Sequence, residues 1–243
     1  MDTTFNYSPN FKIKKRKANQ IKFIIFHYTG MNKESEAIER LTSPKSKVSS
    51  HYLIKNNGEI VVMVPDLYEA WHAGVSSWKN SKSLNKYSIG IEISNPGHDF
   101  NYKKFSKKQI QSLKKISKFL IKKYKINKKN ILGHSDIAPT RKKDPGEKFP
   151  WKYLAKFGIG KWHSLSQKTL IKNRRKKISH IDKKSFFNNL SKIGYSIKSQ
   201  TKFKKDKFLN LIIIAFQIKF RQGLINGKID QECLLISQNL AKK

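Results

Sequence analysis

The sequence has little cysteine and little negative charge. Cys233 is the only cysteine among the 243 residues, so no internal disulfide bond can form and no oxidising compartment is required. Only 16 residues are acidic against 52 basic ones, which gives a formal net charge of +36 at pH 7. Hydrophobic residues still make up 37% of the chain, enough to build a packed core and to argue against general disorder.

Arginine is scarce as well, because 46 of the 52 basic residues are lysine. Surfaces that bind nucleic acids usually use arginine for bidentate and stacking contacts, whereas these lysines are spread along the whole chain. We therefore expect no specific nucleic-acid partner. The charge still favours anionic partners, such as carboxylate-bearing molecules and membrane surfaces.

Long apolar runs are missing. Residues 1–20 contain no apolar core of the length that a signal peptide needs, and the most apolar stretch, Leu209–Phe216, is too short to span a bilayer. These absences predict a cytoplasmic protein, with export by another route left open. We also expect the protein to be a monomer without a transmembrane segment.

Strand and helix patterns alternate along the first two thirds of the chain. The hairpin signal is strong, because Asn56-Asn57-Gly58 separates two β-rich runs. Ser106 is a plausible N-cap for an amphipathic helix. In chain order we expect a strand, a helix, a hairpin, a strand, a helix and a short strand, at residues 22–30, 33–42, 51–65, 88–94, 106–124 and 130–136. The mixture predicts an α+β fold with a mixed central β-sheet flanked by helices.

The composition changes toward the C-terminus. We expect one domain over residues 1–165. Residues 166–184 are polar, strongly basic and without clear periodicity, which predicts a solvated linker; a specific anionic binding site is the alternative. Residues 185–243 contain three short helical patterns and predict a small all-α, three-helix domain.

Two histidines and an aspartate have positions that suit a metal site. His27 and His134 each end an apolar strand, and Asp144 follows ten residues after His134 in a Pro-Gly turn. Two imidazoles and one carboxylate could fill three positions of a tetrahedral zinc site and leave the fourth for water. Each residue taken alone also has a common structural explanation. A histidine at a strand end is often structural, and an aspartate before Pro-Gly is often only part of a turn.

Glu92 lies within an apolar strand, in the sequence SIGIEIS. A carboxylate in such a strand needs an explanation, because burying it without a partner is costly. It either pairs with one of the many lysines or acts as a general base, with a pKa shaped by burial and a nearby metal.

Five sequence blocks together resemble a known family. They are FHYTG, VSSHYLI, AWHAG, SIGIE and GHSDIAPTRKKDPGEKFPW, at residues 26–30, 48–54, 70–74, 88–92 and 133–151. In this order they resemble the N-acetylmuramoyl-L-alanine amidase type 2 family, zinc amidases related to phage amidase lysozymes and peptidoglycan recognition proteins. The resemblance covers roughly residues 20–162. It implies zinc-dependent hydrolysis of the amide bond between N-acetylmuramic acid and L-alanine.

The resemblance also implies roles for individual residues. It makes His27, His134 and Asp144 the zinc ligands, and Glu92 the carboxylate that takes a proton from water and delivers it to the leaving nitrogen. Lys142 corresponds to the lysine that stabilises the developing oxyanion.

Lys143 is the nearest competitor of Lys142 for that role. Related proteins that only bind peptidoglycan have lost a metal ligand, whereas this chain keeps the whole set. The set therefore favours an enzyme over the alternative, a non-catalytic muropeptide-binding protein on the same scaffold.

Further polar and aromatic residues in the blocks are candidates for substrate binding. His72 is expected to line the cleft and contact substrate, with a structural role as the alternative, and Trp71 to pack on a sugar or on the core. Asn85 matches an Asn that precedes SIGIE in the family and is expected to help position substrate. His51 is expected to form a hydrogen bond rather than to bind metal. The remaining histidines are expected to face solvent: His98, His163 and His180.

The C-terminal segment resembles a peptidoglycan-binding domain of the three-helix type. The similar stretches are NNLSKIGY, IIIAFQIKFR and GLINGKIDQECL, but Asn226-Gly227 replaces the usual Asp-Gly and Cys233 stands near a usual Thr. A helical domain that only packs against the amidase is the alternative. We expect recycling of soluble anhydro-muropeptides in the cytoplasm rather than wall lysis; a wall-binding tail would instead favour the cell envelope.

Overall fold

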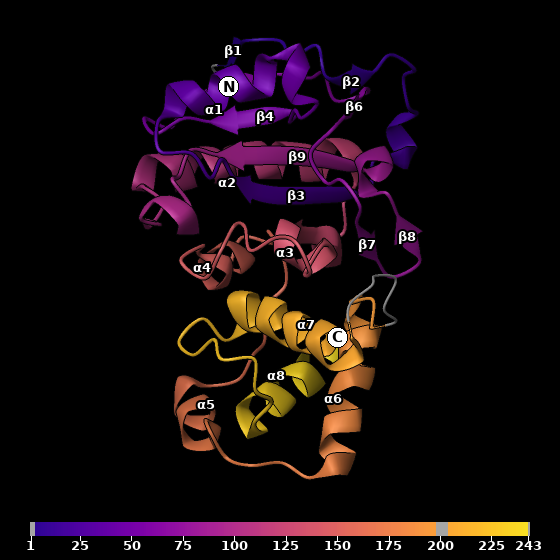
Figure 1. Cartoon of the computed structure of the whole chain (residues 1–243), viewed down its shortest axis with the longest axis vertical. Coiled ribbons are helices and arrows are strands. Elements are labelled where there is room, and N and C mark those ends of the chain that lie inside the picture. The colour runs from indigo at the N-terminus through magenta and orange to yellow at the C-terminus, as the bar shows by residue number, and fades with distance from the viewer. Residues whose placement is uncertain (1–2, 198–203, 243) are drawn as a thin grey trace.

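The structure, a computed structural model, describes residues 3–197 and 204–242. A part built from a sheet and helices occupies one end of the elongated molecule, and the C-terminal helices occupy the other end (Figure 1). Helices α3 (His134–Ile137) and α4 (Trp151–Ala155) lie between the sheet and the C-terminal helices.

The central sheet has six strands in the order β1-β5-β4-β9-β3-β10. Strands β4 and β5 are antiparallel and the other neighbouring pairs are parallel, so the sheet is mixed. The predicted α+β class, the hairpin and the other strands are confirmed, but the last strand ends at Gly133 and residues 134–137 form α3 instead. The six strands are β1 (Thr3–Phe5), β3 (Phe23–Tyr28), β4 (Tyr52–Ile54), β5 (Ile60–Val62), β9 (Ser88–Ile93) and β10 (Ile131–Gly133).

Shorter elements complete the sheet part. Strands β2 (Phe11–Lys12) and β6 (Glu69–Ala70) form one small ladder, and β7 (Ser77–Trp78) and β8 (Ser81–Lys82) form another. The 3₁₀ turns are η1 (Ala18–Gln20), η2 (Pro44–Ser46), η3 (Leu84–Tyr87), η4 (His98–Phe100) and η5 (Lys128–Asn130).

Two helices cover opposite faces of the sheet (Figure 1). Helix α1 (Glu34–Thr42) packs Leu41 against Leu53 of β4. Helix α2 (Lys107–Tyr124) packs against the other face, where Ile54 points, as expected for alternating side chains on a strand. The predicted cap is confirmed: Ser106 Oγ accepts the Gln109 N–H at 3.1 Å.

The predicted C-terminal helices are present as α6 (His180–Ile193), α7 (Lys205–Phe220) and α8 (Gln231–Lys242). The segment predicted as a linker, residues 166–184, contains helix α5 (Gln167–Asn173) and the start of α6. Leu170 of α5 is buried, so part of this segment packs on its neighbours rather than being solvated. The boundaries of the predicted domains stay a prediction.

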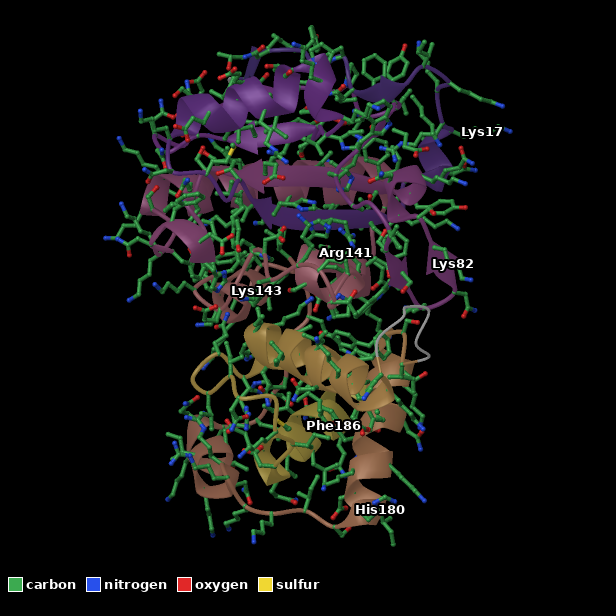
Figure 2. The ribbon with its side chains drawn as sticks, in the orientation of Figure 1. Lys17, Lys82, Arg141, Lys143, His180 and Phe186 are labelled. Carbon is green, nitrogen blue, oxygen red and sulfur yellow. The ribbon has the colours of Figure 1, made fainter. Side chains whose placement is uncertain are left out.

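The sheet and the C-terminal helices share a hydrophobic core. One continuous cluster of buried side chains includes Ile25 of β3 and Leu132 of β10 together with Phe186 of α6 and Phe216 of α7. Figure 2 shows Phe186 pointing inward among the C-terminal helices. Because the cluster crosses from one part to the other, neither part buries its apolar surface alone.

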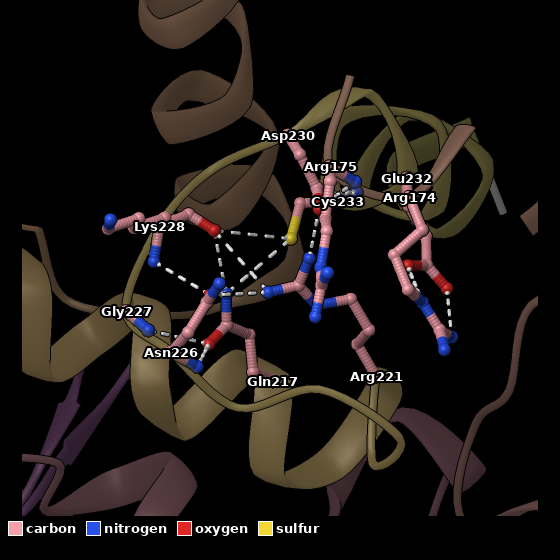
Figure 3. A network of polar contacts seen from close by, with 10 residues as sticks. All are labelled: Arg174, Arg175, Gln217, Arg221, Asn226, Gly227, Lys228, Asp230, Glu232 and Cys233. Atoms are coloured by element: carbon pink, nitrogen blue, oxygen red, sulfur yellow. Dashed lines mark hydrogen bonds and ion pairs between the residues drawn. The ribbon is translucent and has the colours of Figure 1, made fainter. Parts of the chain in front are cut away.

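A buried polar network fixes the loop between α7 and α8 (Figure 3). Gln217 Oε1 accepts the N–H groups of Asn226 and Gly227, both at 2.9 Å, and Gln217 Nε2 donates to the Lys228 carbonyl at 2.8 Å. Arg221 forms an ion pair with Asp230. Gln217 and Arg221 therefore fix this loop through contacts with its backbone and with Asp230.

We expect Phe216→Ala to destabilise the whole chain by about 3–5 kcal/mol, the usual cost of truncating a buried aromatic side chain. Because Phe216 lies in the shared core, calorimetry should still show one unfolding transition, at a lower temperature. Ile171→Ala is the matched control, since Ile171 is exposed and its loss should change stability by less than about 0.5 kcal/mol. Two separate transitions in the wild-type protein would contradict a shared core.

Candidate active site

The parallel strands bring the candidate residues to one edge of the sheet. His27 of β3 and Glu92 of β9 are register partners on neighbouring parallel strands, so their side chains project from the same face. Strand β10 pairs with the other side of β3 and runs directly into α3, whose first residue is His134. Asp144 approaches from the following loop, held by a hydrogen bond from the Ser135 N–H to the Asp144 carbonyl at 2.9 Å.

Three buried ligand atoms converge at this edge. His27 Nδ1, His134 Nδ1 and Asp144 Oδ2 form a triangle in which each of the three distances is 3.0 Å. In a tetrahedral zinc site with bonds of roughly 2.0–2.1 Å, neighbouring ligand atoms are about 3.3 Å apart. The size of the triangle and the donor types therefore fit a metal ion with an open fourth position.

The far nitrogen of the His134 ring sets its tautomer. His134 Nε2 lies 3.2 Å from the Ala73 carbonyl oxygen, which can only accept, so Nε2 carries the proton. Nδ1 is then bare and presents a lone pair to the centre of the triangle. Such a hydrogen bond to the far nitrogen is the usual support of a metal-binding histidine.

A chain of hydrogen bonds sets the tautomer of His27 in the same way. Ser88 donates its one hydroxyl proton to the Leu84 carbonyl at 2.7 Å, so it accepts from His72 Nε2 at 3.1 Å. His72 Nδ1 is then an acceptor and receives the proton of His27 Nε2 at 3.0 Å. Nδ1 of His27 is therefore bare as well.

Electrostatics agree with this assignment. Burial, with the neighbouring His134, lowers the pKa of His27 to about 4, so its ring is neutral at pH 7. An ionised Asp144 carboxylate and the two bare Nδ1 atoms would bring three electron-rich atoms together, an arrangement that a bound cation stabilises.

Glu92 stands beside the triangle with a free oxygen. Its Oε2 is buried and has no hydrogen-bond partner among the described residues. Burial and then the Asp144 charge raise the pKa of Glu92 well above its usual value of 4.5, and Lys142 opposes them. The alternative explanation is an ion pair between Glu92 and a lysine. No contact in the described part of the chain supports it.

A cleft of about 590 Å³ opens over these residues. His27, His134, Asp144 and Glu92 line it together with basic and aromatic side chains, namely Arg40, Arg141, Lys142, Lys143, Trp71, Tyr28 and Phe100. Figure 2 shows Arg141 next to α3 and Lys143 nearer to α4, on the side of the sheet that faces the C-terminal helices. The cleft thus combines a candidate metal centre with a positively charged rim.

The other predicted site residues take different positions. Trp71 and His72 both line the cleft, and His72 also supports His27 through its ring nitrogen. Asn85 lies behind the cleft wall, where its Oδ1 accepts the N–H groups of His72 at 3.2 Å and Ala73 at 2.7 Å. His51 forms hydrogen bonds, as predicted: its Nδ1 accepts the Gly90 N–H at 3.0 Å.

Two predictions of solvent-facing histidines are wrong. His163 is only 7% exposed, beside Trp162. His98 lines the cleft, between the Tyr28 hydroxyl and the Glu147 carboxylate, both at 2.9 Å. The sequence around His98 is turn-like, and its partners lie 70 and 49 residues away along the chain, so no local pattern indicated this position. His180 is exposed, as predicted.

Comparison with known proteins identifies the family. A family model described as N-acetylmuramoyl-L-alanine amidase matches residues 17–147, which is more than half of the chain and includes all the residues of the triangle. The chain belongs to this amidase family.

Proteins with similar sequences are also named as amidases. The chain is 36% identical over 236 residues to the N-acetylmuramoyl-L-alanine amidase AmiD of Escherichia coli, covering 92% of this chain and 83% of AmiD. It is 45% identical over 105 residues to the 1,6-anhydro-N-acetylmuramyl-L-alanine amidase AmpD of the same organism, covering 43% of this chain and 55% of AmpD.

Solved structures extend the similarity to the whole fold. The amidase matches AmiD in complex with its substrate anhydro-N-acetylmuramic acid-L-Ala-D-gamma-Glu-L-Lys with a TM-score of 0.79 and 34% identity, over 95% of this chain and 91% of that one. It matches AmpDH3 of Pseudomonas aeruginosa in complex with anhydromuramic pentapeptide with a TM-score of 0.79 and 30% identity, over 96% of both chains. Within residues 3–197 and 204–242, no helix has the length and apolar character needed to cross a membrane.

We expect the purified amidase to bind one divalent ion per chain at the triangle. Replacing one ligand, as in His134→Ala, should weaken Zn²⁺ binding by more than the roughly 10–100-fold seen when an outer partner of a ligand is replaced. Isothermal titration of the metal-free protein with Zn²⁺ measures this. His180→Ala is the control, because this exposed histidine at the start of α6 (Figure 2) should leave the affinity unchanged. Equal affinities of the two variants would place the metal elsewhere.

Proposed function

We propose that this protein is a zinc amidase that acts on soluble anhydro-muropeptides, cleaving the amide bond between the N-acetylmuramic acid lactyl group and L-alanine. The observation that carries the proposal is the buried triangle of His27, His134 and Asp144 beside the unpartnered carboxylate of Glu92. Ligands of this chemical class in the AmiD and AmpDH3 structures support it. A binding protein without catalysis would gain nothing from a carboxylate whose buried Oε2 has no partner among the described residues, because such burial is costly.

In this proposal His27, His134 and Asp144 hold the zinc ion. When bound there, zinc supplies Lewis-acid chemistry, polarising a carbonyl and making water nucleophilic near neutral pH. Glu92 takes the proton of the attacking water and later returns it to the leaving nitrogen of L-alanine. Its raised pKa suits both steps, because the same group must accept and then donate a proton.

Basic residues on the rim complete the proposed site. Lys142 places its positive charge where the tetrahedral intermediate gathers negative charge. Of the two lysines, it is Lys142 whose charge acts on both Glu92 and His27. Trp71 and His72 line the cleft and contact the substrate in this proposal, and Asn85 helps to position it by holding the N–H groups of His72 and Ala73.

In this proposal, the compartment of the protein and the role of its C-terminal helices depend on which substrate it prefers. A soluble fragment as substrate means recycling in the cytoplasm, whereas intact wall as the preferred substrate means a role in the cell envelope with wall binding by the C-terminal helices. We expect a monomer in either case.

Mass spectrometry of a defined mixture tests the function. The wild-type protein should release free peptide from soluble anhydro-muropeptides faster than from intact sacculi, and a zinc chelator should abolish the release. Glu92→Gln should lower kcat by roughly 10²–10⁴-fold, the usual contribution of a general base, with the zinc content unchanged. Because burial raises the pKa of Glu92, its base form is lost as the pH falls, and the acid limb of the rate profile should lie above pH 4.5. No peptide release from either substrate with zinc present would end the enzymatic proposal.

Variants of the two rim lysines separate their roles. Lys142→Ala should lower kcat by about 10²–10³-fold with little change in KM, as for the loss of one group that stabilises an oxyanion. Lys143→Ala, which removes an equally exposed lysine from the same cleft, should lower kcat less than about threefold. The reverse order in steady-state assays would assign the role to Lys143.

A further inference from the structure

A buried ion pair joins the metal-binding segment to the C-terminal helices. Asp136 lies two residues after His134 in the same short helix, α3, and is 2% exposed. Lys219 of α7, which is 3% exposed, donates from Nζ to Asp136 Oδ2 at 2.6 Å. The Tyr195 hydroxyl, just after α6, donates to Asp136 Oδ1 at 2.6 Å. Both oxygens of one carboxylate are therefore held by the C-terminal helices.

The same carboxylate fixes the backbone next to a metal ligand. Asp136 Oδ2 also accepts the N–H of Gly133 at 2.8 Å, and Gly133 is the residue directly before His134. His134 therefore lies within a tight turn that Asp136 closes through its hydrogen bond with the Gly133 N–H. The direction of the His134 ring depends on this tight turn, because its Nδ1 must meet two other atoms at 3.0 Å.

Lys219 reaches this position through apolar surroundings. Its Nζ lies 4.1 Å from the centroid of the Trp151 ring and 3.4 Å from the Ile131 carbonyl oxygen at the start of β10. Burial lowers the pKa of Lys219, and the Asp136 charge opposes that shift. A buried ion pair of this kind usually adds no more stability than apolar side chains of similar size, whereas losing one partner is costly. The pair therefore favours one particular placement of α7 on α3 over others.

Packing on both sides supports the same placement. Ile137 of α3 belongs to the hydrophobic core that includes Phe216 of α7. Tyr195 packs edge-on against Trp78 of β7, with ring centroids 4.8 Å apart. Gly194 makes this approach possible, since a Cβ atom there would lie 2.4 Å from the Trp78 ring. These apolar contacts hold the C-terminal helices beside α3 and β7, and the Lys219–Asp136 pair is the charged contact at the same place.

We propose that Asp136 is a positioning residue for the metal centre, held in place by Lys219 and Tyr195, so that the C-terminal helices help to set the metal affinity of the amidase. This gives the helices a role that does not depend on binding the cell wall. The inference rests on the proposed function only in taking the triangle of His27, His134 and Asp144 as the metal site.

The test compares the Zn²⁺ affinities of variants, measured by competition with a chromophoric chelator. Lys219→Met, which keeps the length of the side chain and removes its charge, should weaken Zn²⁺ binding about 10–100-fold, as other changes to partners of metal ligands do. Tyr195→Phe removes one hydrogen bond and should weaken it by a smaller factor. With saturating Zn²⁺, KM should stay at the wild-type value, because neither residue lines the cleft.

Arg221→Met is the matched control. It also removes a buried cation near the end of α7, but Arg221 pairs with Asp230 in the α7–α8 loop (Figure 3) and not with Asp136 of α3. Thermal unfolding should show a loss of stability for both methionine variants, while only Lys219→Met changes the Zn²⁺ affinity by more than about twofold. If Lys219→Met does not fold, Tyr195→Phe decides the question by the same measurement.

Either of two results would overturn the proposal. One is a wild-type Zn²⁺ affinity for the folded Lys219→Met and Tyr195→Phe proteins. The other is an equal loss of affinity for Arg221→Met, which would show a general effect of destabilisation. Metal binding is measured without substrate, so a protein that binds Zn²⁺ at the triangle but cleaves no muropeptide would refute the proposed function and leave this inference intact.

Discussion

The convergence of three proton-free atoms is the constraint on which the rest of the structure depends. His27 Nδ1, His134 Nδ1 and the Asp144 carboxylate lie 3.0 Å from one another in a buried place, an arrangement that is unfavourable without a cation. Strand β3 carries His27, strand β10 runs directly into α3 and His134, and Asp144 approaches from the following loop. Hydrogen bonds at the far side of each imidazole then keep the lone pairs pointing inward.

This constraint explains residues that do not touch the centre. Gly90 in β9 leaves the room that the His72 ring occupies, since a Cβ atom there would lie 2.4 Å from His72 Cγ. The hydrogen bond with Ser88 therefore orients the His72 ring, and the hydrogen bond between His72 and His27 orients the His27 ring. Asn85 holds the N–H of Ala73, whose carbonyl orients His134. His72 and Asn85, which the sequence predicts as substrate-binding residues, thus also support the histidines of the triangle.

The sequence predicted the elements that leave a recognisable local pattern of residues. The hairpin, the strands around His27 and Glu92 and the capped helix α2 follow from alternation, turn residues and helical spacing, and the structure has them all. The ligand candidates came from strand ends together with the resemblance of five blocks. The contacts of His98 with Tyr28 and of Asp136 with Lys219 were not predictable, because they join residues 70 and 83 positions apart and neither has a pattern of its own. Helix α5 was missed because its short, basic sequence carries almost no apolar periodicity.

The shared core also bears on which substrate the enzyme suits. An amidase that degrades polymeric wall gains from a binding domain on a flexible linker, because the tether lets the catalytic cleft reach many bonds around one attachment point. Here the C-terminal helices are joined to the sheet by a common core and a buried ion pair, which hold the cleft at a fixed distance from them. A rigid arrangement suits a substrate that enters the cleft as a whole, and a volume of about 590 Å³ is in the range of small-molecule sites. The same packing that places His134 therefore favours a soluble muropeptide over a polymer.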